Sequence, residues 1–412
     1  MKSVNKELLA MPAFRRLLSA RTISNFGNGL SPVAVAFGVL SLPGATAKTL
    51  SLVMAVHLAP LVLFMLFGGV VADRFPRALV VGVSDIFLSI AIITNGLLLM
   101  NNHATVTSFM VVALIGGTLN ALWWPAFSGM VPEIVDEDHL QPANGFVALV
   151  SNTANILGAV TGGIIVAAVG AGVAIVIDGV TFLIAGLLVL QLRRFGKTRE
   201  TTEHSPSVFD DLIHGWKEFS SRKWIVTIVA GYSMIAMVFE SGFAVVGPVF
   251  AKESLGGPKP WSWILASLSI GMAVGVIVTM KFKPRYPLIV GLSVQAGMVS
   301  WFLAMGFTKS IGLAMLTAFL CGFGMDFFMV LWQTALQTEV PNESLSRVSS
   351  YDAFGSLFFA PLGLVIAGPI VTAIGAQATF KLFAVLLATV VIAMLLVKDV
   401  RTLESRQPAE II

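Results

Sequence analysis

The chain has 412 residues, of which 56% are hydrophobic and 12% are charged, with a formal net charge of +4. Soluble proteins carry about 25% charged residues, so this composition cannot cover a water-soluble globule, and we expect a membrane protein with many spans. The basic residues are scattered among short loops, which argues against a nucleic-acid partner. The single cysteine, Cys321, excludes an intrachain disulfide and lies in an apolar run, where we expect it to pack.

Twelve apolar segments are long enough to cross a bilayer, which takes about 20 helical residues. The first six lie at 14–40, 49–71, 79–100, 105–130, 143–168 and 173–192. The second six lie at 224–251, 261–281, 288–306, 311–337, 347–372 and 377–398. The sequence therefore predicts an all-α membrane protein whose halves, 1–192 and 224–398, are joined by a polar segment at 193–223 and followed by a tail at 399–412.

Lysine and arginine predict the orientation. If both termini are cytoplasmic, the cytoplasmic segments hold about four times as many of these residues as the segments on the opposite side. Cytoplasmic loops of membrane proteins carry such an excess of lysine and arginine. The N-terminus lacks a signal peptide's short apolar core and small-residue cleavage site, so we expect the first helix to remain as an anchor. The prediction is a multi-pass protein with both termini in the cytoplasm.

The two halves repeat. The segment at 135–146 aligns with the segment at 340–351. At the same offset, three glycines of the first half meet three of the second: Gly158, Gly163 and Gly170 meet Gly363, Gly368 and Gly375. This agreement predicts two parallel six-helix pseudo-repeats around a central cavity.

The polar segment between the halves has a helical pattern of its own. Its apolar residues recur at helical spacing, at Phe209, Leu212, Ile213, Trp216 and Phe219. This spacing indicates a short amphipathic helix at the cytoplasmic interface, which we interpret as an anchor between the halves, with regulation as the alternative.

Five acids fall inside the predicted spans: Asp85, Asp178, Glu240, Asp326 and Asp352. No lysine or arginine is predicted in mid-span to neutralise them. A charge at a helix centre in the bilayer costs about 2.5–3.5 kcal/mol, so intramembrane acids are functional candidates. An unpaired carboxylate away from water usually takes up a proton, which is what a proton-coupled transporter requires.

The acids are not equivalent. Glu240 and Asp326 lie near the middle of the seventh and tenth helices, so they are candidates for a proton or substrate site. The alternative for both is a protonated acid that is hydrogen-bonded inside the protein. Asp178, near the outer end of the sixth helix, we interpret as structural, with an outer gate as the alternative. His57 could titrate near neutrality, but a lone histidine is more often a packing residue.

Other polar and aromatic residues extend the candidate site. Asn25 and Asn28 lie beside glycines and Pro32, which suggests a kinked helix that lines a cavity. Trp124 and Gln333, in the fourth and tenth helices, would suit a bulky, partly apolar substrate. Anchoring at the membrane interface is the alternative for the tryptophan.

A charged loop at 72–78 separates the second and third helices. Its pattern of Gly69, Asp73, Arg74 and Arg77 resembles the corresponding loop of the major facilitator superfamily, with Pro76 where a glycine is usual. An ordinary positively charged cytoplasmic loop is the alternative. The resemblance implies a cytoplasmic gate formed by these four residues, and we expect Asp85 and Asp352 to join it. It also implies that helices 1, 4, 7 and 10 line the cavity, where Glu240 and Asp326 would face it.

The fifth helix resembles the exporter branch of that superfamily. It keeps the glycines of the branch's helix-packing pattern at Gly145, Gly158, Gly162 and Gly163. Ala154 and Ala159 replace a glycine and a proline of the pattern. The fourth helix lacks the arginine that many drug:proton antiporters carry, which leaves the coupling mechanism open.

The segments PEIVDEDHLQPANGF (132–146) and LWQTALQTEVPNESLSRVSSYDAFGS (331–356) resemble the branch of macrolide-efflux and siderophore-export proteins. The resemblance implies a monomeric, proton-driven exporter of an amphipathic small molecule in the bacterial cytoplasmic membrane. It implies no cofactor and no ATPase subunit, and the chain has no phosphate-binding loop and no metal-ligand spacing. A lysophospholipid facilitator of the same fold is the alternative, and a polytopic enzyme or receptor is a remote one.

Overall fold

The computed structural model describes residues 7–136, 139–194, 216–282 and 284–404. The side chains at 66–70, 72–73, 141, 342–343 and 346 are also outside the description. Every regular element in the described part of the chain is helical, and twelve helical spans are long and apolar enough to cross a membrane. The predicted all-α fold with twelve spans is confirmed.

The first half contains six spans. They are α2 (Pro12–Leu40), α3 (Ala47–Arg74), α4 (Arg77–Met100), α5 (Val106–Ser128), α7 (Leu140–Val169) and α8 (Ala171–Leu190). The sequence pattern did not indicate the short helix α6 (Met130–Ile134), which follows α5. A 3₁₀ turn, η2 (Gln191–Arg194), ends α8.

The second half has more broken spans. Its seventh span runs through α10 (Lys223–Ser241), the π-helical η3 (Gly242–Val246), α11 (Gly247–Phe250) and the π-helical η4 (Ala251–Leu255). The rest are α12 (Pro258–Thr279), α13 (Pro287–Val294), α14 (Ala296–Phe307), α15 (Ile311–Glu339), α16 (Asn342–Leu357), α17 (Ala360–Ile374), α18 (Ala376–Leu396) and α19 (Lys398–Arg401). α13 with α14, and α16 with α17, each form one interrupted span.

Glycines set how closely the helices of the first half approach. A Cβ atom at Gly158 of α7 would lie 2.0 Å from the carbonyl oxygen of Phe26, and one at Gly29 of α2 would lie 2.1 Å from that of Asn155. α2 and α7 therefore pack backbone against backbone, which larger side chains would prevent. Gly145, by contrast, has open space within 4 Å of its Cβ position, so close packing does not depend on it here.

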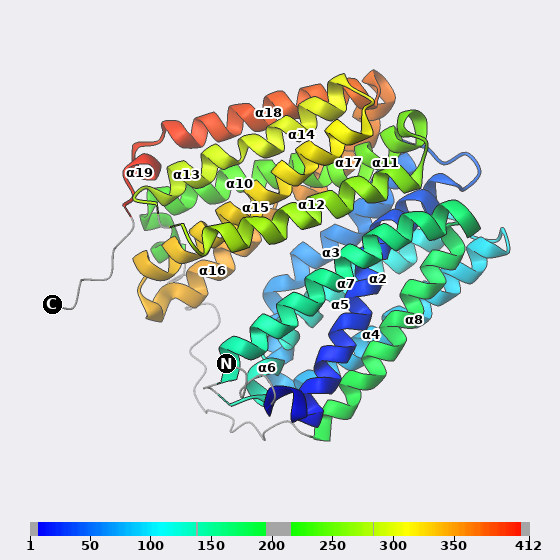
Figure 1. The fold of residues 1–412 in the computed structure, drawn as a ribbon, viewed down its shortest axis with the longest axis horizontal. Coiled ribbons are helices and arrows are strands. Elements are labelled where there is room, and N and C mark those ends of the chain that lie inside the picture. Colours follow the sequence, from blue (N-terminus) through cyan, green and yellow to red (C-terminus); the bar gives the residue numbers. More distant parts are fainter. Residues whose placement is uncertain (1–6, 137–138, 195–215, 283, 405–412) are drawn as a thin grey trace.

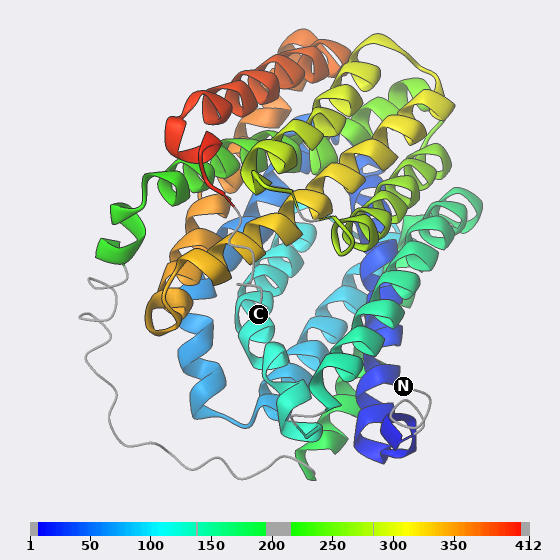
Figure 2. The same cartoon turned by 60° about the vertical axis from the view of Figure 1, so that its left-hand side comes forward.

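The halves form two bundles side by side, with the start of α2 and the last helix, α19, at the same end of the molecule (Figure 1). We call this end the termini side and the opposite end the far side. The bundles meet on the far side, where α7 packs against α12 and α3 packs against α17 (Figure 2). Lys252 Nζ donates to the Leu40 carbonyl oxygen at 2.5 Å, and Ser51 Oγ donates to the Leu364 carbonyl oxygen.

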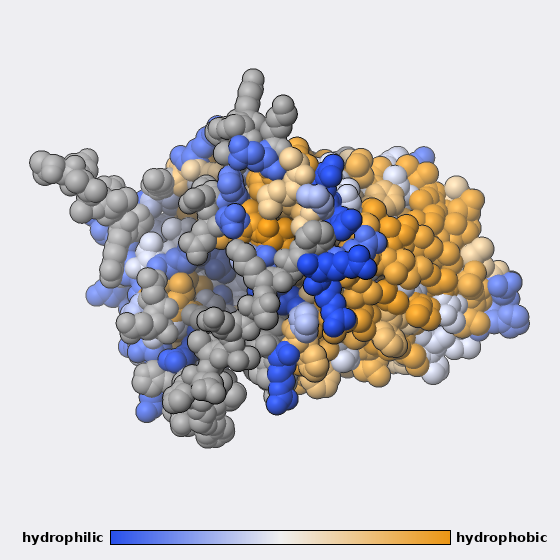
Figure 3. Space-filling model, turned by 90° about the horizontal axis from the view of Figure 1, so that it is seen from below, coloured by the Kyte–Doolittle hydropathy of each residue, from blue (hydrophilic) through white to orange (hydrophobic). Residues whose placement is uncertain are grey.

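The outer surface is apolar over most of the bundle. In Figure 3, hydrophobic residues cover the flank while hydrophilic ones gather towards the chain ends and in a band across it. Large apolar side chains are exposed on this surface, among them Phe87 and Val385 with 64% and 61% of their areas accessible. Contiguous exposed apolar surface of this kind is what lipid contact requires.

Candidate functional site

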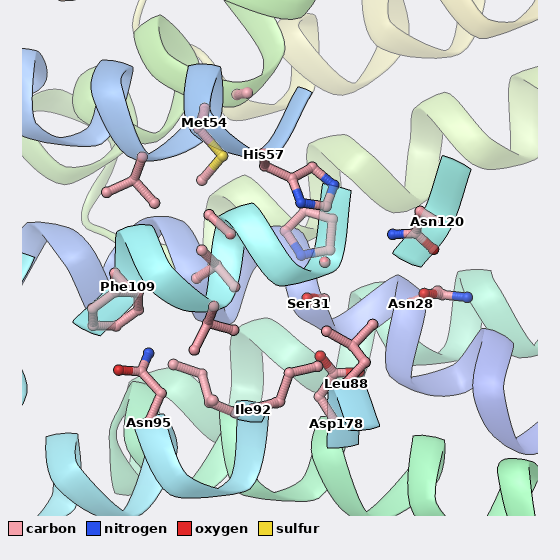
Figure 4. A pocket seen from close by; sticks show the side chains of 18 of the residues that line it. Asn28, Ser31, Met54, His57, Leu88, Ile92, Asn95, Phe109, Asn120 and Asp178 are labelled. Carbon is pink, nitrogen blue, oxygen red and sulfur yellow. The ribbon is translucent and has the colours of Figure 1, made fainter. Parts of the chain in front are cut away.

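A cavity of about 350 Å³ lies inside the first half and is closed on one side by the second half. The walls come from α2, α3, α4, α5 and α8, together with the junction of α10 and η3 (Figure 4). Of the lining residues that the structure describes, Glu240, Phe243 and Ala244 come from the second half. Both halves therefore line the cavity, and the first half contributes most of the lining residues.

The lining is apolar with a few polar groups. Its polar side chains are Asn28, Ser31, His57, Asn95, Asn120, Asp178 and Glu240. Leucine, isoleucine, valine, methionine and phenylalanine supply most of the rest, and no lysine or arginine is among the described lining residues. An apolar pocket with a small number of convergent polar groups is the usual form of a small-molecule site.

Asp178 is placed by a glycine on the neighbouring helix. A Cβ atom at Gly27 of α2 would lie 2.5 Å from Asp178 Oδ1 and 2.1 Å from Thr181 Oγ1, so only glycine lets α2 pass this close. The acid is 2% exposed, and its Oδ1 has no hydrogen-bond partner in the described structure. Figure 4 shows its side chain beside Ser31 at the cavity wall. A buried oxygen without a partner is unusual and marks the carboxyl group as a functional candidate.

His57 is placed by two glycines of α5. A Cβ atom at Gly117 would lie 1.9 Å from the His57 carbonyl oxygen, and one at Gly116 would lie 3.3 Å from its Nδ1. α3 therefore approaches α5 closely, and the imidazole ring projects into the cavity (Figure 4). The histidine that the sequence suggested as a packing residue is a cavity residue that also packs.

Glu240 lies one residue before the end of α10, next to the π-helical turn η3. Single π-helical turns are rare and often occur at functional sites. Glu240 lines the cavity together with Phe243, opposite the lining residues of the first half. Glu240 and Asn28 are the two members of the predicted proton or substrate site that line this cavity.

The other members of that predicted site lie elsewhere. Asn25 is buried between helices, where its Nδ2 donates to the Arg21 carbonyl oxygen at 2.8 Å and to Ser151 Oγ at 3.2 Å. Trp124 is 62% exposed, Gln333 is exposed and Asp326 is half-buried outside the cavity. The structure instead adds Asn95 and Asn120, whose only sequence signal is an amide within an apolar helix.

The residues of the predicted gate are not gathered in the described structure. Arg77 Nη1 donates to the Gly129 carbonyl oxygen at 2.6 Å, and Arg77 Nε lies 3.5 Å from Glu133 Oε1. Asp352 accepts from Trp332 Nε1 at 2.9 Å and from Ser356 Oγ at 3.3 Å.

The other members of the predicted loop gate are Arg74, Gly69 and Asp73. Arg74 is exposed, and the side chains of Gly69 and Asp73 are outside the description. In the central segment, Phe209, Leu212 and Ile213 also lie outside it. Trp216 and Phe219 are described, and both rings contact Tyr351, with centroids at 5.6 Å and 5.8 Å.

One expectation is wrong. The sequence predicts no lysine or arginine in mid-span, but Arg21 is only 9% exposed within α2. Its guanidinium carbon lies 4.9 Å and 4.2 Å from the ring centroids of Trp123 and Phe127, and its charge interacts with that of Asp85. Arg21 lies inside the predicted span 14–40 and inside α2, so the first helix carries its arginine into the bundle, where the two aromatic rings and Asp85 surround it.

Comparison with known proteins gives the family. The model of the Major Facilitator Superfamily matches residues 17–356. The uncharacterized MFS-type transporter YfiS of Bacillus subtilis (strain 168) is 23% identical over 401 residues, covering 95% of this chain and 94% of YfiS. The multidrug efflux pump Tap of Mycobacterium tuberculosis (strain ATCC 25618 / H37Rv) is 26% identical over 383 residues, covering 90% and 89%.

Solved structures share the fold. The nucleoside transporter NupG superposes with a TM-score of 0.75 at 15% identity, covering 94% of this chain and 100% of NupG. An inward-facing, unoccupied bacterial homolog of the human lysosomal transporter Spinster gives 0.69 at 16% identity, covering 93% and 94%. With a family match over most of its length and this fold, the chain belongs to the major facilitator superfamily.

Proposed function

We propose that this protein exports an amphipathic small molecule from the bacterial cytoplasm in exchange for protons, by alternating access of one central site. The observation that carries the proposal is the cavity: an apolar chamber into which three titratable side chains, His57, Asp178 and Glu240, project from both halves. A relative that is named as a multidrug efflux pump supports the substrate class.

The lining favours neutral or cationic substrates. Apolar walls would hold the hydrocarbon part of the molecule, while the amides and acids would hold its polar or charged part. A cationic group and a proton can each neutralise the same buried carboxylate. Competition between them for one acid is a simple chemical basis for exchanging a proton against a substrate.

The contacts between the halves indicate which side of the cavity is closed in this conformation of the alternating-access cycle. Contacts between α3 and α17 and between α7 and α12 hold the far side closed. If the chain ends are cytoplasmic, as the distribution of lysine and arginine predicts, then this conformation would receive substrate from the cytoplasm. Rocking of the two repeats about the cavity would then expose it on the far side.

Inverted membrane vesicles with an acidified lumen test the proposal. Macrolides, dyes and siderophores are added one at a time while the lumen pH is followed. We expect one class of compound to alkalinise the lumen with the wild-type protein but not with Glu240→Gln. The matched control is Glu253→Gln, which changes an exposed acid of η4 and should behave as wild type.

Two results would contradict the proposal. If Glu240→Gln exchanges protons as fast as wild type, Glu240 is not a proton carrier. If none of the compounds changes the lumen pH, proton-coupled export is wrong, and a lysophospholipid-flipping assay would then test the lipid facilitator.

A further inference from the structure

On three helices, the face that lines the cavity continues beyond it towards the termini side. On α2, Arg21 precedes Asn28 by seven residues, which is two turns on the same face. On α4, Asp85 precedes Leu88 by three, and on α5, Trp123 follows Asn120 by three. Because residues three and seven apart share a helix face, these side chains lie below the cavity on the termini side.

The side chains meet there. We call Arg21, Asp85, Trp123 and Phe127 the floor cluster. The rings of Trp123 and Phe127 stack with centroids 4.7 Å apart and an interplanar angle of 8°. The Arg21 guanidinium group lies over both rings, at 4.9 Å and 4.2 Å, within the range of a cation–π interaction.

Asp85 completes the cluster with a buried negative charge. It is 3% exposed, its charge interacts with that of Arg21, and it lies close to the Trp123 indole. Arg21 Nε is also buried and has no hydrogen-bond partner in the described structure. A guanidinium group and an indole N–H therefore lie close to one buried carboxylate.

The surroundings of Asp85 offer few other charges. From α8, Gly186 packs against it, with a Cβ position 3.0 Å from Asp85 Cβ. α5 contributes Trp123, and α2 contributes Arg21. Nearer the termini side, η2 contacts α4 and carries Arg193 and Arg194, and Arg77 at the start of α4 is engaged with Glu133 and Gly129.

We propose that Asp85 is a second proton-exchange site, between the cavity and the termini side, and that Arg21 is the positioning residue that controls it. The inference rests on the proposed proton-coupled function and deepens it. The Asp85 carboxylate gains a proton from water in the cavity and returns it to water on the termini side, so only O–H bonds form and break. The guanidinium group favours the ionised carboxylate, and the aromatic faces hold that group in place when Asp85 is neutral.

Carbodiimide labelling of the purified full chain in lipid nanodiscs tests this without any transported substrate. The reagent modifies protonated carboxyl groups in apolar surroundings, and mass spectrometry of the peptide around Asp85 measures the yield. In the wild type we expect the yield to rise as the pH falls, because the reagent needs the protonated carboxyl group. In Arg21→Gln the rise should move to higher pH by at least one unit, which is about tenfold in yield where the yield is low.

Control variants separate the effect of Arg21 from general disturbance. Arg15→Gln makes the same change at an exposed position of α2 and should leave the profile as in wild type. Arg21→Lys keeps the charge and should stay closer to wild type than Arg21→Gln. Trp123→Phe removes the indole N–H beside Asp85 and should raise the yield, whereas Trp124→Phe, next to it on the exposed surface, should not.

The outcomes are separable. A yield at Asp85 that does not change with pH in the wild type overturns the second site, even if Arg21→Gln fails to fold. A profile that is identical in Arg21→Gln and wild type overturns the role of Arg21. Because the labelling needs no transported substrate and the vesicle assay compares Glu240→Gln with wild type, a failure of the second site can be distinguished from a failure of proton-coupled export.

Discussion

Glycines on one helix leave room for titratable side chains of the neighbouring helix. Asp178 reaches the cavity because Gly27 has no side chain, and His57 does so because α5 presents Gly116 and Gly117. In both cases the glycine and the titratable residue belong to different helices. The chemistry of the cavity therefore depends on pairs of residues, one that carries a function and one that leaves room for it.

Asp178→Asn tests the first of these pairs. The amide cannot release a proton, so we expect proton-coupled flux to fall by at least about tenfold, or ~1.4 kcal/mol in activation free energy. Counterflow of a substrate identified in the vesicle assay should persist, because the shape of the side chain is kept. Asp399→Asn, at an exposed position of α19, is the matched control. Undiminished flux in Asp178→Asn would show that Asp178 has a structural role only.

Cys321→Ser should leave transport unchanged. Cys321 is fully buried, and its nearest polar contact is Met325 Sδ at 3.9 Å, so it performs no chemistry that a hydroxyl group would remove. A serine at this position can donate to a carbonyl oxygen of its own helix. Flux in vesicles that contain equal amounts of each protein measures the result, and a clear loss would show that the sulfur matters beyond packing.

The pH dependence of stability has one contribution outside the spans. Hydrogen bonds from Tyr286 and Arg285 to Glu404, both 3.0 Å, lower the pKa of the Glu404 carboxyl group, and Glu404 raises the pKa of Arg285. A lowered folded-state pKa stabilises the fold above the unfolded pKa, about 4.3, and this contribution disappears as the pH falls through the folded value.

Glu404→Gln should therefore be slightly less stable than wild type at pH 7 and equal to it once the pH is well below about 4. Because both partners are exposed, we expect a small effect that added salt weakens. Thermal unfolding at the two pH values measures it, with the exposed Glu253→Gln as control. If the stability difference between Glu404→Gln and wild type grows as the pH falls, the pKa of Glu404 is not lowered in the folded protein, and the prediction is contradicted.

At the scale of the elements, glycine decides which helices can touch. α2 and α7 meet at Gly29 and Gly158, where the backbone of each helix fills the space that a side chain would need. α10 is different, because two π-helical turns, η3 and η4, interrupt its span near Glu240. The first half is therefore held by close helix contacts, and the second half has an irregular helix at the cavity.

Gly158→Ala compared with Gly145→Ala tests the close contact. At Gly158 the new methyl group would meet the Phe26 carbonyl oxygen, and we expect a loss of about 1–3 kcal/mol in unfolding free energy. At Gly145 nothing lies within 4 Å, and alanine should stabilise the helix by about 0.5–1 kcal/mol. Denaturant unfolding in detergent measures both. Equal effects of the two substitutions would mean that α2 and α7 do not approach as described.

At the scale of the whole molecule, contacts on the far side hold the halves together. A Cβ atom at Gly163 of α7 would lie 2.0 Å from Ser262 Oγ of α12, and one at Gly368 of α17 would lie 2.7 Å from the Ala47 carbonyl oxygen. Ser51 adds hydrogen bonds from α3 to α17. A Cβ atom at Gly163 would also lie 2.9 Å from the Pro258 carbonyl oxygen, so we expect an added side chain to part the halves there.

Gly163→Val should open the far side. In a Cys321→Ser background with the reporter Asn28→Cys in the cavity, we expect a membrane-impermeant maleimide applied to the far side to react at least about tenfold faster than without Gly163→Val. Gly312→Ala, which has nothing within 4 Å of its Cβ position at the far-side end of α15, is the control. An unchanged rate would show that this contact does not close the far side.

The sequence alone determined the number of spans, the division into two halves and the family. Apolar length fixes a span because the bilayer has a fixed thickness, and the charged loop and repeated glycines are local patterns. It also identified Glu240 and Asn28, since a polar group inside an apolar helix can be seen without a structure. It could not tell which of the five intramembrane acids share a space, because periodicity gives a face of each helix but not the neighbour of that face.

The tertiary structure determined which residues on different helices are neighbours. It placed Asp178 and His57 in the cavity, and it placed Asp85 beside Arg21 and apart from Arg77 and Asp352. The physical reason is that helix contacts are set by small residues on other helices, far away in the sequence. Gly117 and Gly158 let helix backbones approach, and Gly27 leaves room for the Asp178 and Thr181 side chains. The resulting helix arrangement determines which charged side chains meet.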